Sequence, residues 1–187
     1  MKRTLYFSMV CLLSAFSAVG QIGLRGLKPI EKQKLQLPEL PASQSRVTLL
    51  RSSENVDYTQ GVFILNEDWF GHNNSTINFM TSSGDFAYRI LQTANPGKEL
   101  GCTSQFGTIF GDNMFITSKQ PKDGGASIEG GRLNVVDAKT MKVKAQFTDI
   151  GGGDGRAFLG VNDSVGYIGA SSGILLFDIK NLTVGDQ

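Results

Sequence analysis

The sequence predicts an all-β protein assembled from β-propeller blades of four antiparallel strands, with an incomplete set of blades. The first observation is a repeat, because three short apolar segments each carry an aromatic residue near their centre. These aromatic residues are Phe63, Phe115 and Tyr167, at a constant spacing of 52 residues. A fixed period of this size is typical of solenoids and propellers. The second observation is the 23 glycines among 187 residues, which favour many turns between short strands.

Each repeated segment is followed by a second strand, a turn and a third strand. The repeated segments span 61–64, 113–117 and 165–169, the second strands 76–80, 133–137 and 174–178, and the third strands 85–90, 141–147 and 182 onward. Two further strands, 104–110 and 156–161, precede the later repeats and join them through turn residues at 111–113 and 162–164. Four short antiparallel strands per unit are typical of a propeller blade. A β-sandwich, the main alternative, would not explain the repeated order of segments.

Turn chemistry supports these boundaries. Asp137 and Asp178 stand at equivalent positions at the end of a strand, and we expect their carboxylates to cap the turns that follow. The glycine-rich segment 151–156 superficially resembles a phosphate-binding loop. It lacks the Lys-Ser/Thr ending and a following helix, so we expect a tight connection between blades instead.

The repeats in this sequence are too few to complete a propeller. Residues 61–187 hold two full units and part of another, whereas propellers have roughly four to eight blades. We expect a fragment of a longer propeller, with assembly from several chains as the alternative. An open array of blades would expose the apolar sides of its terminal blades.

Residues 1–20 are predicted to form a signal peptide. Lys2 and Arg3 precede an uncharged apolar stretch, 5–19, that is too short to span a bilayer comfortably, and small residues follow before Gln21. Cys11 lies within this stretch without the arrangement expected of a lipoprotein cleavage site. The prediction is therefore export to the periplasm or the cell surface.

Two regions follow the predicted signal peptide. Residues 21–57 contain three prolines, mixed charges and several serines without a clear period, and we expect a linker or an extended arm. Residues 58–187 are the predicted partial propeller domain.

Composition argues against several classes of function. The 18 basic and 17 acidic residues form no basic stripe, so nucleic acid is not expected as a partner. His72 is the only histidine, which excludes metal sites built from several imidazoles, and no Gly-x-Ser-x-Gly motif is present. Cys102 has no evident activating partner and is expected to be a buried, inert thiol. We therefore predict a protein that is not an enzyme and that uses no cofactor.

One face of the predicted blades carries the long loops. Strand alternation places loops 65–75 and 118–131 on the same face as the connections between blades at 91–103 and 150–155. Exposed aromatic, amide and charged residues on such loops favour a recognition surface, although the two aromatic residues at 69 and 70 could instead pack over the end of a blade. The candidate ligand-binding residues are Trp69, Phe70, His72, Asn73, Lys119, Gln120, Asp154 and Arg156.

The segment 61–79, with the sequence Gly-Val-Phe-Ile-Leu-Asn-Glu-Asp-Trp-Phe-Gly-His at its start, resembles the opening blade of YncE-like propellers in Bacteroidetes envelope proteins. Segments 118–120, 130–140 and 153–160 are similar to the same family. The resemblance covers residue 58 to the end of the chain. It implies a seven-bladed propeller, of which this chain carries about three blades, in the periplasm or at the cell surface and without enzymatic activity. Some relatives bind cobalamin and work with an outer-membrane transporter.

Three hypotheses about function follow. The first is an exported, non-enzymatic binding or scaffold protein that uses the loop face for a small molecule such as a corrinoid or a glycan. The second is the cobalamin-binding component of an outer-membrane uptake system, with an outer-membrane transporter as partner. The third is a propeller-type hydrolase or lyase whose catalytic residues lie on missing blades.

Overall fold

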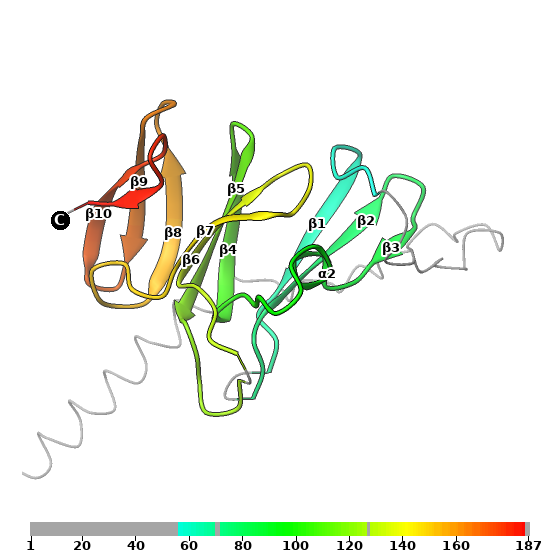
Figure 1. Cartoon of the computed structure of the whole chain (residues 1–187), viewed down its shortest axis with the longest axis horizontal. Helices are drawn as coiled ribbons and strands as arrows, with labels where there is room; N and C mark the ends of the chain where they lie inside the picture. Colours follow the sequence, from blue (N-terminus) through cyan, green and yellow to red (C-terminus); the bar gives the residue numbers. More distant parts are fainter. Residues whose placement is uncertain (1–55, 70–71, 127, 186–187) are drawn as a thin grey trace, which may run out of the picture. The chain divides into compact units, whose positions relative to one another are not determined.

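The computed structural model describes residues 56–69, 72–126 and 128–185, which form three antiparallel sheets and one short helix (Figure 1). The predicted signal peptide 1–20, nearly all of the predicted arm 21–57 and Phe70 lie outside the described residues. No helix in the described part of the chain is long and apolar enough to cross a membrane. The predicted fold class is confirmed: the protein is all-β, and its sheets follow the strand plan of propeller blades.

The sheets are built from strands in chain order. The first sheet contains β1 (Gly61–Asn66), β2 (Thr76–Thr81) and β3 (Phe86–Ala87), and is followed by the helix α2 (Ile90–Ala94). The second contains β4 (Cys102–Phe110), β5 (Asn113–Gln120), β6 (Leu133–Asp137) and β7 (Val143–Phe147). The third contains β8 (Gly155–Gly160), β9 (Val165–Ala170), β10 (Gly173–Asp178) and β11 (Thr183–Val184).

The repeated apolar segments form β1, β5 and β9, as the period predicts. Neighbouring strands pair antiparallel throughout, for example Phe115 with Val135 in the second sheet and Tyr167 with Leu176 in the third. One predicted strand is wrong at its end, because the segment 85–90 leaves the sheet after Ala87 and Ile90 begins helix α2. In helix α2 both Ile90 and Leu91 are buried, and both belong to the apolar cluster between the first and second sheets.

The two aspartates at equivalent positions cap their turns as predicted. Asp137 Oδ1 accepts hydrogen bonds from the backbone N–H groups of Lys139 and Thr140, both at 3.0 Å. Asp178 Oδ1 accepts one from the N–H of Asn181 at 2.9 Å, which holds the pKa of this carboxyl below its ordinary value. Each turn ends in a residue with positive φ, 56° at Met141 and 52° at Leu182. The second and third sheets therefore share the same turn.

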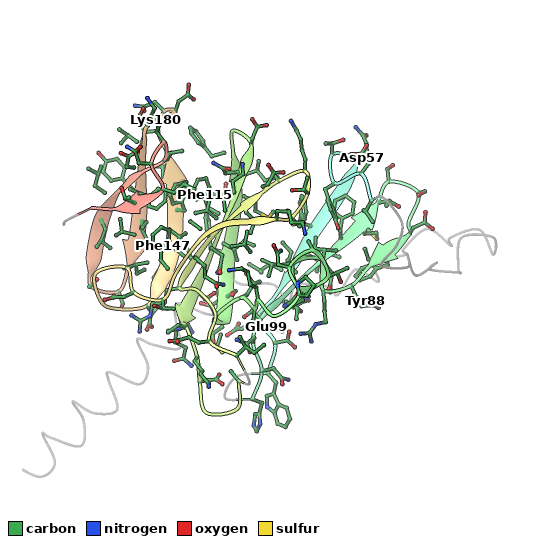
Figure 2. The ribbon with its side chains drawn as sticks, viewed as in Figure 1. Asp57, Tyr88, Glu99, Phe115, Phe147 and Lys180 are labelled. Atoms are coloured by element: carbon green, nitrogen blue, oxygen red, sulfur yellow. The ribbon has the colours of Figure 1, made fainter. Side chains whose placement is uncertain are left out.

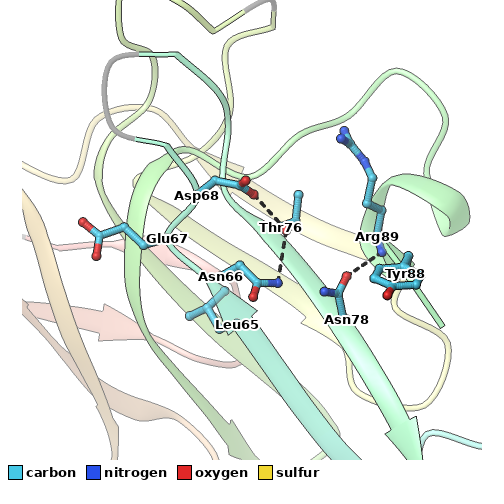
Figure 3. Close-up of a pocket in the computed structure, with 8 residues that line it drawn as sticks. All are labelled: Leu65, Asn66, Glu67, Asp68, Thr76, Asn78, Tyr88 and Arg89. Carbon is cyan, nitrogen blue, oxygen red and sulfur yellow. Dashed lines mark hydrogen bonds between the residues drawn. The ribbon is translucent and has the colours of Figure 1, made fainter. Parts of the chain in front are cut away.

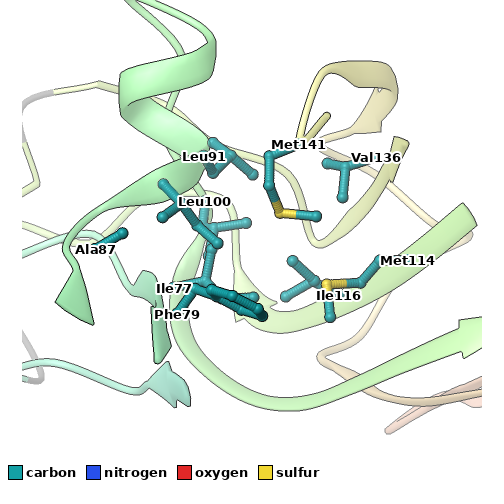
Figure 4. Close-up of a cluster of buried hydrophobic side chains, with 10 residues drawn as sticks. Ile77, Phe79, Ala87, Leu91, Leu100, Met114, Ile116, Val136 and Met141 are labelled. Carbon is teal, nitrogen blue, oxygen red and sulfur yellow. The ribbon is translucent and has the colours of Figure 1, made fainter. Parts of the chain in front are cut away.

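A cluster of buried apolar side chains lies between the first and second sheets (Figure 4). The first sheet supplies Ile77 and Phe79 from β2, and the second supplies Met114 and Ile116 from β5. Phe63, the first aromatic residue of the repeat, packs against this cluster with its ring 4.9 Å from that of Phe79. The alternation of side chains along these strands gives each sheet one face toward the next sheet.

A second cluster, rich in aromatic rings, joins the second and third sheets. Phe115 is fully buried, and its ring stacks on that of Phe158 with centroids 3.8 Å apart and planes 5° apart. Phe177 meets both rings edge-on, and Phe147 from β7 packs at the side of the cluster (Figure 2). Edge-to-face and offset stacked rings stabilise such a core beyond their buried area.

The glycine-rich connection into the third sheet is a tight turn, as predicted. Gly151, Gly152 and Gly153 have φ values of 85°, 84° and 78°, a region that other residues enter only with strain. The side chain of Asp149 accepts hydrogen bonds from the N–H groups of Gly152 and Gly151. At Gly155 a side chain would lie 2.6 Å from the carbonyl oxygen of Ser118, so glycine lets the third sheet approach the second closely.

Candidate binding site on the loop face

The predicted loop face is held together by the side chain of Asn74. Its Nδ2 donates hydrogen bonds to the carbonyl oxygens of Leu100 and Ile128, both at 2.8 Å. These three residues belong to three different connections, 65–75, 91–103 and 118–131, so one buried amide ties all of them. The N–H of Ser75 adds a 2.9 Å hydrogen bond to the carbonyl of Gly101. The inference that these loops share a face is thus supported by direct contacts.

An open cleft of about 690 Å³ lies at the first sheet, next to this face (Figure 3). Its floor is polar, because Asn66 donates a 3.2 Å hydrogen bond to Thr76 Oγ1, and Thr76 donates a 2.9 Å bond to the Asp68 carboxylate. The backbone N–H of Arg89 donates to Asn78 Oδ1 at 2.8 Å on the other side. The cleft is lined by Leu65, Asn66, Glu67, Asp68, Thr76, Asn78, Tyr88 and Arg89.

A smaller hollow of about 240 Å³ shares two residues with the cleft, Asp68 and Arg89. Its other lining residues come from three connections: Asn73, Asn74, Glu99 and Gly125. Glu99 is fixed at its wall, since one carboxylate oxygen lies 3.1 Å from Arg89 Nη2 and the other accepts a 2.7 Å hydrogen bond from Gln92 Nε2. Because they share Asp68 and Arg89, we treat the cleft and the hollow as one candidate site.

Both shared residues have a left-handed backbone. The φ of Asp68 is 63° and that of Arg89 is 50°, values uncommon for residues other than glycine. Residues held in such conformations cost of the order of 1–3 kcal/mol and are enriched at functional sites. For Arg89 the conformation follows from the end of β3, where the chain turns into helix α2 and the N–H of Arg89 reaches Asn78.

Trp69 and His72 form an exposed aromatic pair beside the hollow. Their rings stack with centroids 3.6 Å apart, and the N–H groups of His72 and Asn73 donate to the carbonyl oxygen of Trp69 at 3.0 and 3.2 Å. Trp69 is 66% exposed, so its ring does not pack over the end of the sheet. Of the predicted site residues, Trp69, His72 and Asn73 therefore lie in one turn, and Asn73 lines the hollow.

The remaining predicted residues that the structure describes lie on the second and third sheets. Asp154, just before β8, and Arg156, within β8, form an ion pair at 2.8 Å, and the N–H of Asp154 donates to Ser171 Oγ at 2.7 Å. Lys119 and Gln120 end β5 and are half-buried. None of these four residues lines the cleft or the hollow. The structure thus separates the predicted set into two groups.

The site found in the structure includes residues that the sequence did not single out. Tyr88, Arg89 and Glu99 come together only because β3 is short and helix α2 follows it, and the segment 85–90 gave no signal of that break. Asp68 could have been found, since it directly precedes Trp69 in a long polar loop.

The chemistry of the site is that of a polar receptor. Three carboxylates (Glu67, Asp68 and Glu99) and one guanidinium (Arg89) line it, which gives an excess of negative charge and many hydrogen-bond acceptors. Tyr88 and Trp69, both exposed, offer aromatic surface at its edges. This combination suits a neutral or cationic ligand rich in hydroxyl or amino groups, and disfavours anions.

Other reactive groups in the described residues lie elsewhere. Cys102 is fully buried, and burial raises the pKa of its thiol, which disfavours the reactive thiolate form. Among the described residues no group of three or more His, Cys, Asp and Glu side chains is arranged to hold a metal ion.

Comparison with known proteins identifies the family of this chain. No curated protein sequence matches the chain. A family model described as a domain of unknown function, DUF5074, matches residues 60–187, which include all three sheets and the candidate site. The chain therefore belongs to the DUF5074 family.

Proposed function

We propose that this protein is an exported, non-enzymatic binding module that uses the loop face of its propeller-like blades to hold a ligand rich in hydroxyl or amino groups, such as a glycan. The observation that carries the proposal is the pair of neighbouring spaces, the cleft and the hollow, which share Asp68 and Arg89 in their linings. Strained backbone at both residues and the exposed Trp69 and Tyr88 support it. Export to the periplasm or cell surface and membership of a larger YncE-like propeller group are parts of the same proposal.

The polar lining favours a glycan over a corrinoid. Sugars present hydroxyl groups that carboxylates and amides bind, and an apolar sugar face that stacks on an aromatic ring. A corrinoid carries a larger apolar surface, whereas polar side chains dominate the lining of the cleft and the hollow. Cobalamin is therefore the comparison ligand in the test.

The single tryptophan of the chain makes a direct assay available. Because Trp69 is the only tryptophan and lies on the loop face, its fluorescence reports on this face alone. We expect a saturable change in emission when cell-wall oligosaccharides are added, confirmed by titration calorimetry, and a weaker response to cobalamin. A stronger response to cobalamin would favour an uptake component instead.

Two variants locate the site. Asp68→Asn should weaken oligosaccharide binding about tenfold or more, as expected when a central acceptor loses its charge. Lys139→Ala is the matched control, since Lys139 lies in the β6–β7 turn and pairs with Asp112, away from the cleft and the hollow. Equal binding by both variants would show that the cleft is not the ligand site.

A further inference from the structure

The hollow beside the cleft is walled by three connections and by the residue that precedes helix α2. Its volume of about 240 Å³ lies just below the roughly 300–1,000 Å³ of sites for drug-sized molecules. The hollow therefore suits one functional group or one sugar ring, and the rest of a ligand would lie outside it. The polar atoms of its lining determine which group that is.

The positive charge of Arg89 is compensated within the hollow. Its Nη2 lies 3.1 Å from Glu99 Oε1, and the other carboxylate oxygen of Glu99 accepts a 2.7 Å hydrogen bond from Gln92 Nε2. The side chain of Glu99 is only 12% exposed, so its carboxylate is held in this pair and is little available to a ligand. The pair adds no net charge to the lining.

Asp68 is the carboxylate that this pairing leaves over. Its Oδ2 accepts a 2.9 Å hydrogen bond from the hydroxyl of Thr76, which is a neutral donor (Figure 3). Among the described residues no Lys, Arg or His forms an ion pair with Asp68. The lining of the hollow therefore carries one uncompensated negative charge, which favours a positively charged group.

Asn74 adds a fixed hydrogen-bond acceptor to the same hollow. Its side chain is buried, with 8% exposed, and its Nδ2 donates to the carbonyl oxygens of Leu100 and Ile128. The reverse orientation of the amide would place Oδ1 against these two carbonyl oxygens, so the positions of nitrogen and oxygen are determined. Because Asn74 lines the hollow and both Nδ2 hydrogens are used, Oδ1 is the atom that it can offer to a ligand.

We propose that the hollow binds a protonated primary amine, and that the ligand of the loop face is a glycan containing unacetylated amino sugars. The proposal rests on the glycan-binding function proposed above and names the substrate class. An ammonium group is a compact charge with three donors and no acceptor. The Asp68 carboxylate and Asn74 Oδ1 provide acceptors for it, one of them charge-assisted. The acetylated form of the same sugar is neutral and larger at this position.

An aromatic ring beside the hollow favours an amino sugar over a linear polyamine. Trp69 is 66% exposed and directly precedes the turn that carries Asn73, one of the residues lining the hollow. The apolar face of a sugar ring can pack on such an aromatic surface while its amine lies in the hollow. A polyamine has no corresponding flat apolar face.

Two matched oligosaccharides test the inference. The chitosan tetrasaccharide carries free amines and the chitin tetrasaccharide carries acetylated ones, on the same sugar backbone. Both are titrated by Trp69 fluorescence and calorimetry in a mildly acidic buffer that keeps the sugar amines protonated. We expect the chitosan tetrasaccharide to bind about tenfold more tightly, because hydrogen bonds to charged groups are stronger than those between neutral groups. Added salt should reduce this difference.

Asp68→Asn should lose the preference for free amines, because the uncompensated charge is removed. The variant is expected to fold, since asparagine tolerates the φ of 63° at this position and its side-chain oxygen can still accept from Thr76. Asp112→Asn is the matched control and should keep the preference. Asp112 lies in the turn between β4 and β5, and its side chain is 75% exposed and pairs with Lys139.

The outcomes separate this inference from the proposed function. Equal affinity for the two tetrasaccharides, or tighter binding of the acetylated one, would overturn the inference while glycan binding stands. Binding of neither would also overturn it, and the cell-wall oligosaccharides then decide the proposed function alone. A preference that survives in Asp68→Asn would refute the role of the hollow. Tighter binding of spermidine than of the chitosan tetrasaccharide would refute the assignment to a sugar.

Discussion

Replacing Phe115 by alanine removes an aromatic ring from the middle of the contact between the second and third sheets. The ring is fully buried, stacks on Phe158 at 3.8 Å and meets the edge of Phe177 at 5.9 Å. Loss of a buried phenylalanine costs about 3–5 kcal/mol, and the lost ring pairs keep this site above the lower end of that range. We therefore expect Phe115→Ala to lower the free energy of unfolding by about 4 kcal/mol.

The same position in the next repeat provides a matched control. Tyr167 stands 52 residues later but is 40% exposed in the single chain. Tyr167→Ala should cost about 1 kcal/mol, well below the loss at position 115, because a large part of the Tyr167 side chain is exposed to solvent in the folded protein. The difference in destabilisation between the two variants therefore measures how much the packing of the third sheet over the Phe115 ring stabilises the protein.

Urea unfolding followed by far-ultraviolet circular dichroism measures both values, provided that the dependence of the free energy on urea stays constant among variants. If Phe115→Ala does not fold, Phe115→Leu, with an expected loss of about 1–1.5 kcal/mol, takes its place. Equal losses at positions 115 and 167 would refute the assignment of Phe115 to a contact between sheets.

Three further outcomes test other parts of the fold. Asn74→Ala should destabilise the protein by about 2 kcal/mol in the same urea assay, because two carbonyl oxygens lose their donor. Gly152→Ala should cost about 1 kcal/mol for its φ of 84°, whereas Gly124→Ala, where φ is not positive and space is open, should be neutral or slightly stabilising. Hydrogen bonding by the N–H groups of Gly152 and Asn181 lowers the folded-state pKa of Asp149 and Asp178, respectively. Their stabilising contribution is complete well above the ordinary pKa of 3.8 and is lost as the pH falls through the lowered folded-state values, so the melting temperature should drop on acidification, and less so in Asp178→Asn.

The sheets could be predicted from the sequence because their signal is local and repeated. The apolar segments around Phe63, Phe115 and Tyr167 recur at one spacing, and the turns after Asp137 and Asp178 have the same chemistry. Such patterns depend on strand alternation and turn residues, which need no knowledge of the rest of the fold.

The candidate site was predicted only in part because it depends on contacts distant in the sequence. Trp69, His72 and Asn73 were found from the composition of their loop. Arg89 reaches the site because β3 ends early and its N–H finds Asn78, eleven positions earlier in the chain. Asp154 and Arg156 form an ion pair with each other. From the sequence alone, two charged residues that pair with each other look the same as two that bind a ligand.

The unequal connections at the two ends of the strands have an evolutionary consequence. Strands β4 and β5 join through two residues, and the turns after β6 and β10 share one design, so insertions there would disturb the pairing of the sheets. The loops after β1 and β5 are long and leave the sheets at the end tied by Asn74 (Figure 1). Insertions or deletions in these loops would change the surface at that end of the sheets and leave the strand register unchanged. Loop length can therefore vary in this fold without a new scaffold.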